Sequence, residues 1–239
     1  MPPVDMPLGR ITKRTTLQDS IYAELRASLM RGHFDPGQAL IVQSLAETLH
    51  TSTMPVRGAL MQLASENALH VLPTGTTQVP HVSIAKLQDL RVARIALEGL
   101  AAELACERIT AAQLRELKRN IEEHERAIEH DGLYPMLDKN QEFHFLIYRA
   151  SQSTVLPHLI ENLWLQFGPY MRVLSKHIGA PATKTFSPNG TNYHYLIVAG
   201  LKKKDPIATR RAIEDDINRT VDLLMELLTA DAAAHKFPQ

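Results

Sequence analysis

Apolar residues recur at three- and four-residue intervals along most of this chain, which is the spacing of an amphipathic helix. Within residues 44–69 the pattern is broken once, by the polar residues 50–53, and then resumes. Ser52 or Thr53 can cap the second helix, and Pro55 falls in its first turn, where proline removes no helical hydrogen bond. The stretch therefore predicts a helix-turn-helix, two short helices joined by a tight turn.

The flanking residues predict the rest of a small domain. Residues 17–31 carry a helical apolar face that ends at Gly32. Short extended segments are expected at residues 39–42, 68–72 and 77–82, with a turn at Thr74, Gly75 and Thr76 between the last two. A helix, a helix-turn-helix and a hairpin together form a winged helix-turn-helix. Its second helix can enter the major groove of double-stranded DNA.

Beyond residue 82 almost every pattern is helical. The expected helices cover residues 83–108, 111–130, 133–151, 155–175, 189–203 and 206–229, and the longest loop covers residues 176–187. Six amphipathic helices in one segment predict a bundle. The expected fold is mostly α, with a flexible N-terminal arm (1–16), a winged helix-turn-helix domain (17–82), an all-α bundle of about six helices (83–232) and a tail (233–239).

Composition narrows the classes of protein only slightly. The chain has 26 basic and 26 acidic residues, so charge neither supports nor excludes a DNA-binding protein. The single cysteine, Cys106, lies in an apolar helical run and is expected in the core. No run of about 18 apolar residues predicts a membrane span, and the N-terminus lacks the apolar core of a signal peptide. We therefore expect a cytoplasmic protein that does not enter a membrane.

Five polar residues of the bundle fall on otherwise apolar helix faces. Arg94 lies on the face of the first bundle helix, Asn140 and His144 share the face of the third, and His194 and Asp216 lie on the last two helices. Buried charge is costly unless it is paired or binds a metal. Two imidazoles, a carboxylate and an amide oxygen suit a divalent ion such as zinc, nickel or manganese. The alternative is a hydrogen-bonded core without metal, in which Asp216 pairs with Arg94.

Further candidates follow from residue chemistry. The planar guanidinium of Arg94 can bind a carboxylate of a small organic acid with two hydrogen bonds. Trp164 and Arg172, on the fourth bundle helix, are candidates to line a cavity together with Arg94; the alternatives are a core tryptophan and a surface arginine. The remaining histidines considered show no convergent spacing and are expected at the surface: His33, His50, His124, His130, His158 and His177.

The stretch LIVQSLAETLHTSTMPVRGALMQLASENAL, preceded by the proline and glycine of HFDPGQAL, resembles the winged-helix half of the GntR family of bacterial transcription regulators. The segments RVARIALEGLAAELA, EFHFLIYRAS and NYHYLIVAGLKKKDPIATRRAIEDDI resemble the effector domain of its FadR-type subfamily, the FCD domain. The resemblance covers residues 17–230. It implies a homodimer on a palindromic operator, and an effector domain that holds a small carboxylate, often beside a metal ion.

The resemblance also assigns residues. It implies metal ligands at Asn140, His144 and His194, and at position 216 this chain has aspartate where the family has histidine. Arg57 is the only cation on the recognition helix, the second helix of the helix-turn-helix, and it can bind phosphate or guanine. The alternative role for Arg57 is a surface ion pair with Glu66. The candidate DNA contacts are Gln43, Ser52, Thr53, Met54, Arg57, Thr74 and Gly75.

Together these features predict a DNA-binding transcriptional regulator, a repressor of a metabolic operon that responds to a small carboxylate bound beside a divalent metal. One alternative is a metal-dependent enzyme built on the helical bundle, but no second carboxylate is placed as a general base, and the winged helix would have no use. A second alternative is an architectural DNA-binding protein without an effector. The apolar-face position of Arg94 argues against that alternative.

Overall fold

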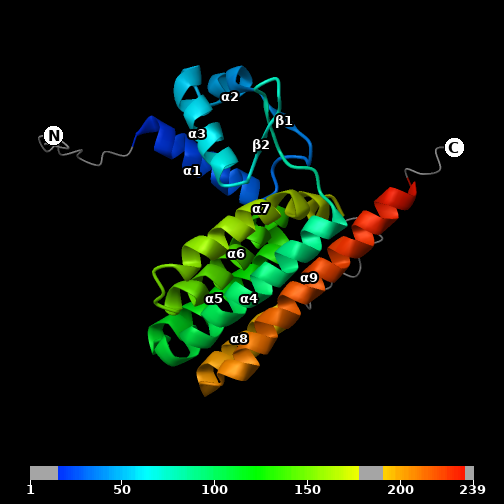
Figure 1. Cartoon of the computed structure of the whole chain (residues 1–239). Helices are drawn as coiled ribbons and strands as arrows, with labels where there is room; N and C mark the ends of the chain where they lie inside the picture. Colours follow the sequence, from blue (N-terminus) through cyan, green and yellow to red (C-terminus); the bar gives the residue numbers. More distant parts are fainter. Residues whose placement is uncertain (1–15, 178–190, 235–239) are drawn as a thin grey trace, which may run out of the picture.

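The structure, a computed structural model, describes residues 16–177 and 191–234. Within these residues the chain forms nine α-helices, one π-helical turn and three short strands, so the predicted mostly α fold is confirmed (Figure 1). Residues 1–15 of the expected arm, residues 178–187 of the expected loop and residues 235–239 of the expected tail lie outside the described part of the chain.

The first three helices and the strands form one unit, the winged domain. Its elements are α1 (Leu17–Met30), β1 (Ala39–Leu40), α2 (Val42–Thr48), α3 (Thr53–Ser65), β2 (His70–Val71) and β3 (Thr77–Gln78). The antiparallel sheet has the order β1-β3-β2, so β3 pairs with both other strands. His50 lies in the turn between α2 and α3 with φ of 49°, a left-handed conformation that histidine tolerates better than most residues. Ser52 is the N-cap of α3.

The remaining elements form the helical bundle: α4 (Ile84–Arg108), α5 (Ala111–Arg126), the π-helical turn η1 (Ala127–Asp131), α6 (Leu133–Ala150), α7 (Leu156–His177), α8 (Asn192–Lys203) and α9 (Pro206–Ala234). Ser83 caps α4, and Thr110 forms a capping box with Gln113 at the start of α5. The long helix α9 lies antiparallel to α4 along one side of the bundle (Figure 1). Within the described residues, no helix is apolar over a length that would cross a membrane.

The winged domain rests on α7, and the contact combines close backbone packing with ion pairs. Gly168 of α7 faces α1 so closely that an added Cβ atom would meet the carbonyl group of Leu29. Around this crossing, Arg31 of α1 lies 2.5 Å from Asp138 of α6. The absence of a side chain at Gly168 therefore sets the distance between the two units.

We predict that Gly168→Ala destabilises the protein, although removing a glycine from a helix ordinarily stabilises it by about 0.5–1 kcal/mol. The added methyl group has to displace the α1 backbone, which should cost about 1–3 kcal/mol in free energy of unfolding. Gly99→Ala in α4 is the matched control, because there the methyl group would meet the flexible Arg210 side chain at 3.3 Å. Urea unfolding measures both; equal stability of the two variants would contradict the packing argument.

Candidate functional site

The bundle encloses a cavity of about 350 Å³ between α4, α5, α6, α7 and α9. The structure brings five of the predicted site residues to its wall: Arg94, Asn140, His144, Trp164 and Asp216. They come from four helices, and all except Trp164 lie on helix faces that sequence periodicity predicted to be turned inward. A cavity of this size can hold a small organic molecule.

One end of the cavity is organised by a buried carboxylate, Glu98, which the sequence interpretation did not single out. Glu98 is 0 % exposed and accepts two hydrogen bonds from Arg94, with Nε to Oε1 at 2.6 Å and Nη2 to Oε2 at 3.3 Å. The Trp164 indole and the Tyr148 hydroxyl also donate to this carboxylate, at 3.1 and 2.5 Å. Three helices, α4, α6 and α7, are therefore joined at one anion.

Arg94 is fixed by its neighbours on all sides. Its guanidinium carbon lies 4.9 Å from the centre of the Trp164 ring and 4.5 Å from that of Phe167, so aromatic faces cover the cation. Burial by itself would lower the pKa of Arg94, but the adjacent Glu98 carboxylate outweighs burial and raises that pKa. The side chain is consequently a rigid, permanently charged donor at the cavity wall.

A second cluster follows from the first through Tyr148. The Tyr148 hydroxyl oxygen lies 3.2 Å from His144 Nδ1, and His144 Nε2 lies 3.1 Å from an oxygen of Asp216. His144, His194 and Asp216 each offer one ligand atom, and these atoms all lie within 4.8 Å of one another. Asp216 pairs with His144, so the alternative in which it pairs with Arg94 is wrong.

The imidazole of His194 is the member of this cluster that lacks hydrogen-bond partners among the described residues. The ring is 0 % exposed and stacked on Phe143 at 4.0 Å between ring centres, yet neither ring nitrogen has a hydrogen-bond partner in the described structure. Burial lowers the pKa of His194 to about 3, so the ring is neutral near pH 7. A neutral imidazole with a free nitrogen pair is the form that ligates metals.

His124 was expected at the surface, and that expectation is wrong. The ring is 4 % exposed, it lines the cavity, and its centre lies 5.3 Å from that of His194. Burial lowers the pKa of His124 to about 4, and its Nδ1 has no hydrogen-bond partner among the described residues. The spacing of Leu117, Ile121 and His124 on one face of α5 was the available signal.

Arg172 is placed elsewhere by the structure. Its Nε donates to Asp35 of the winged domain at 2.8 Å, and its Nη1 donates to the Tyr134 hydroxyl at 3.2 Å. Lys176 lies 2.7 Å from the same Asp35 carboxylate. These contacts hold the pKa of Asp35 at about 2, mainly through the hydrogen bond from Arg172. Arg172 therefore joins the winged domain to α7. The prediction that Arg172 lines the cavity is wrong.

The predicted DNA contacts lie on α2, on α3 and in the turn between β2 and β3 of the winged domain. Arg57 is exposed on α3, and Glu66, its alternative partner, instead bonds Tyr22 at 2.6 Å and faces Arg26 at 3.8 Å. The remaining candidates are exposed or half-exposed: Gln43 on α2, Ser52, Thr53 and Met54 at the start of α3, and Thr74 and Gly75 in the turn between β2 and β3. Gly75 has φ of 82°, a conformation that suits glycine at the tip of the wing.

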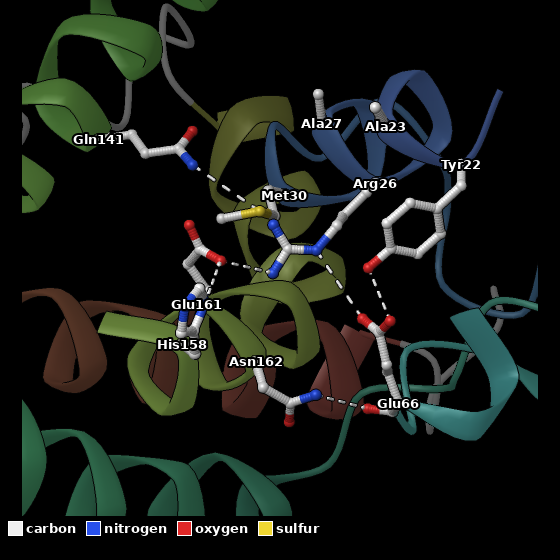
Figure 2. A pocket seen from close by; sticks show the side chains of 10 residues that line it. All are labelled: Tyr22, Ala23, Arg26, Ala27, Met30, Glu66, Gln141, His158, Glu161 and Asn162. Carbon is white, nitrogen blue, oxygen red and sulfur yellow. Dashed lines mark hydrogen bonds and ion pairs between the residues drawn. The ribbon is translucent and has the colours of Figure 1, made fainter. Parts of the chain in front are cut away.

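A second, open pocket of about 500 Å³ lies between the winged domain and the bundle, beside their contact (Figure 2). Arg26 of α1 occupies it, 3.3 Å from Glu161 of α7 and facing Glu66 of the winged domain. Asn162 of α7 donates to the Glu66 carbonyl at 3.1 Å. The charged groups here already pair across the two units, so this pocket is a polar joint between them.

Comparison with known proteins agrees with both halves of this arrangement. Residues 17–79 match the family described as bacterial regulatory proteins, gntR family, and residues 89–219 match the FCD domain. The chain is 32% identical over 221 residues to the HTH-type transcriptional regulator McbR of Escherichia coli K12, a match that covers 92% of this chain and 98% of McbR. It is 23% identical to the HTH-type transcriptional repressor RspR of the same strain, over 88% and 90% of the two chains.

Solved structures show the same fold. The structure titled E. coli McbR/YncC superposes with a TM-score of 0.82 at 30% identity, covering 89% of this chain and 99% of that one. A GntR regulator from Rhodococcus sp. RHA1 superposes with a TM-score of 0.68 at 16% identity, covering 89% and 98%. The reported relatives are regulators, which disfavours the enzyme alternative. The chain therefore belongs to the GntR family of DNA-binding transcription regulators, in the FadR-type branch that carries an FCD domain.

Proposed function

We propose that this regulator is a homodimeric, cytoplasmic repressor of a metabolic operon, and that a small organic acid in the bundle cavity controls its affinity for DNA. The observation that carries the proposal is the charged wall of that cavity, where Arg94 lies with His144 and Asp216, and His194 completes the cluster of the last two behind the wall. The name of the relative RspR, a transcriptional repressor, supports the repressor assignment.

Arg94 supplies the first half of the acid site. Two of its nitrogens, Nε and Nη2, are engaged by Glu98, and Nη1 has no hydrogen-bond partner in the described part of the chain. Because the side chain is clamped by Trp164 and Phe167, a carboxylate that enters the cavity meets a donor that does not have to be ordered first.

The residues present also fit a divalent metal. His144, His194, Asp216 and the nearby Asn140 would hold the ion, and the two unpartnered nitrogens of His194 are the observation that favours it. Such an ion supplies positive charge for the acid at the cavity wall. The buried Nδ1 of His124 makes this residue a further candidate ligand.

The winged domain has a sparse set of cations for DNA. Of the arginines between residues 17 and 82, Arg26 and Arg31 pair with Glu161 and Asp138 of the bundle, which leaves Arg57. Each phosphate neutralised contributes about 0.9 to the salt dependence, so we expect a log–log slope no steeper than about −10 for a dimer. In the dimer the two α3 helices should lie about 34 Å apart, one turn of DNA.

The helices α6 and α7 connect the two sites. On α6, Asn140 and His144 face the cavity, while Asp138 reaches Arg31 of the winged domain. On α7, Met171 faces the cavity, and the neighbouring Arg172 binds Asp35. An acid that shifts either helix therefore acts on the ion pairs that orient the winged domain, and it changes DNA affinity if it binds the two orientations unequally.

Arg57→Ala should weaken binding of the dimer to operator DNA by at least about 30-fold, because each well-placed arginine is worth about 1–3 kcal/mol and the variant dimer loses two. The probe is a duplex that the wild-type protein enriches from a random pool, and fluorescence anisotropy measures its affinity. Arg149→Ala, an exposed arginine on α6, is the control. Equal affinities of the two variants for the duplex would show that Arg57 does not contact the DNA.

Protein purified without a nickel column should contain about one divalent ion per chain, and chelation should lower Tm by roughly 5–10 °C, as expected for a site filled well above its Kd. His144→Ala should lose both the ion and the chelator effect. His158→Ala, whose side chain is 81% exposed, should keep them. Mass spectrometry of the ion and thermal unfolding report the result. Wild-type protein that is metal-free and insensitive to chelation would refute the metal site.

Replacing the buried pair as a unit, Arg94→Met with Glu98→Gln, should leave a folded protein that no longer responds to acids. A well-packed neutral substitute for a buried ion pair is often neutral in stability, whereas Arg94→Met alone should cost about 3–5 kcal/mol, because it leaves the Glu98 charge unpaired. A thermal-shift screen of small acids measures the response. An acid whose stabilising effect survives in the double variant would remove Arg94 from the proposed site.

A further inference from the structure

Two antiparallel helices, α6 and α7, supply more than half of the residues that line the effector cavity. The residues of α6 that line it fall at positions 133, 136, 137, 140 and 144, a stripe of about 16 Å at a rise of 1.5 Å per residue. The helix α7 runs in the opposite direction beside it. The Trp164 ring lies 5.5 Å from the His144 ring at one end, and Arg172 donates to the Tyr134 hydroxyl at the other. Position along α6 therefore corresponds to position along the cavity.

The two ends of the cavity differ in chemistry. At the His144 end lie the charged groups, Arg94 and Asp216. At the Tyr134 end, Met136 and Leu137 belong to a separate apolar cluster, against which Leu133 and Met171 pack. Ile128 and Leu174 add further apolar surface to the cavity wall. Arg94 and Asp216 thus lie at one end of this axis, and at the other end the lining side chains of α6 and α7 are apolar.

We propose that the effector is a monocarboxylic acid with an apolar body of several carbon atoms, its carboxylate at Arg94 and its body along Met136, Leu137 and Met171. This inference rests on the proposed acid-binding function and specifies its ligand class. Each methylene group buried against the apolar end should tighten binding about fourfold. A hydroxyl placed there has no side-chain partner on these three residues and should weaken binding roughly tenfold. Sugar acids and hydroxy acids are accordingly poor ligands.

A dicarboxylate is the main competing ligand class, because a second arginine touches the cavity. Arg219 of α9 lies at the wall, with its guanidinium carbon 6.0 Å from the centre of the Tyr193 ring. If Arg219 received a second carboxylate, a diacid would bind more tightly than a monoacid of the same length. Acids that differ only at the far end therefore separate the two classes.

The test uses Trp164, the only tryptophan of the chain, as the reporter, since its ring lies in the cavity wall. Full-length wild-type protein is titrated with acetate, butanoate, hexanoate and octanoate, and with adipate and gluconate as six-carbon polar counterparts of hexanoate. Fluorescence follows Trp164, and calorimetry provides an independent Kd. We expect affinity to rise with chain length, and hexanoate to bind at least tenfold more tightly than adipate or gluconate.

Two methionine variants locate the effect. Met171→Gln keeps the side-chain size but makes the apolar end polar, so the gain from butanoate to octanoate should shrink at least tenfold while acetate binding is unchanged. Met225→Gln, a half-buried methionine of α9, should behave as wild type. Equal or tighter binding of adipate or gluconate than of hexanoate would overturn the inference and leave the acid site standing. If none of these acids binds by calorimetry, the acid site itself is contradicted.

Discussion

A carboxylate without solvent contact, Glu98, is the constraint on which the bundle depends. A buried anion is tolerated only when donors surround it, and here Arg94, Trp164 and Tyr148 supply them from α4, α7 and α6. Tyr148 extends the network to His144, which pairs with Asp216 of α9. Four helices are thereby held in one register, and the same groups form the charged end of the cavity. Packing and the proposed ligand recognition share a single set of contacts.

Under the proposed function, this shared set of contacts carries a change inside the bundle to the DNA. Two helices, α6 and α7, carry cavity residues on one face and partners of the winged domain on another. At the crossing of α1 with α7, Gly168 allows backbone contact, so little side-chain material can absorb a displacement of α7. The ion pairs of Arg26, Arg31 and Arg172 then transmit it, and they also withdraw Arg26 and Arg31 from the DNA face. Within residues 17–82 this leaves Arg57, the proposed DNA contact, as the arginine that does not pair with the bundle.

Much of this arrangement was predictable from local rules, because helix periodicity and caps are local. Periodicity also placed Arg94, His144, His194 and Asp216 on inward faces, and the structure brings them to one region. Three residues were missed or misplaced by the sequence analysis, each for a physical reason. From the sequence, Arg94 alone was singled out on its helix, whereas the buried face of α4 also includes Glu98, one turn from Arg94. His124 lies on a helix with few apolar residues. Arg172 donates a hydrogen bond to Asp35, which is 137 residues away in the sequence, and a local sequence pattern cannot predict such a pairing.

The proposed function requires that ligand binding in the cavity and DNA binding by α3 are linked in free energy, and such linkage is reciprocal. The most direct test is to measure, by calorimetry, the Kd of a cavity-binding acid with and without saturating operator DNA, beside the Kd of the DNA with and without the acid. The account predicts that both affinities change by the same factor, at least about fivefold. An acid that binds equally well to free and DNA-bound protein would contradict it.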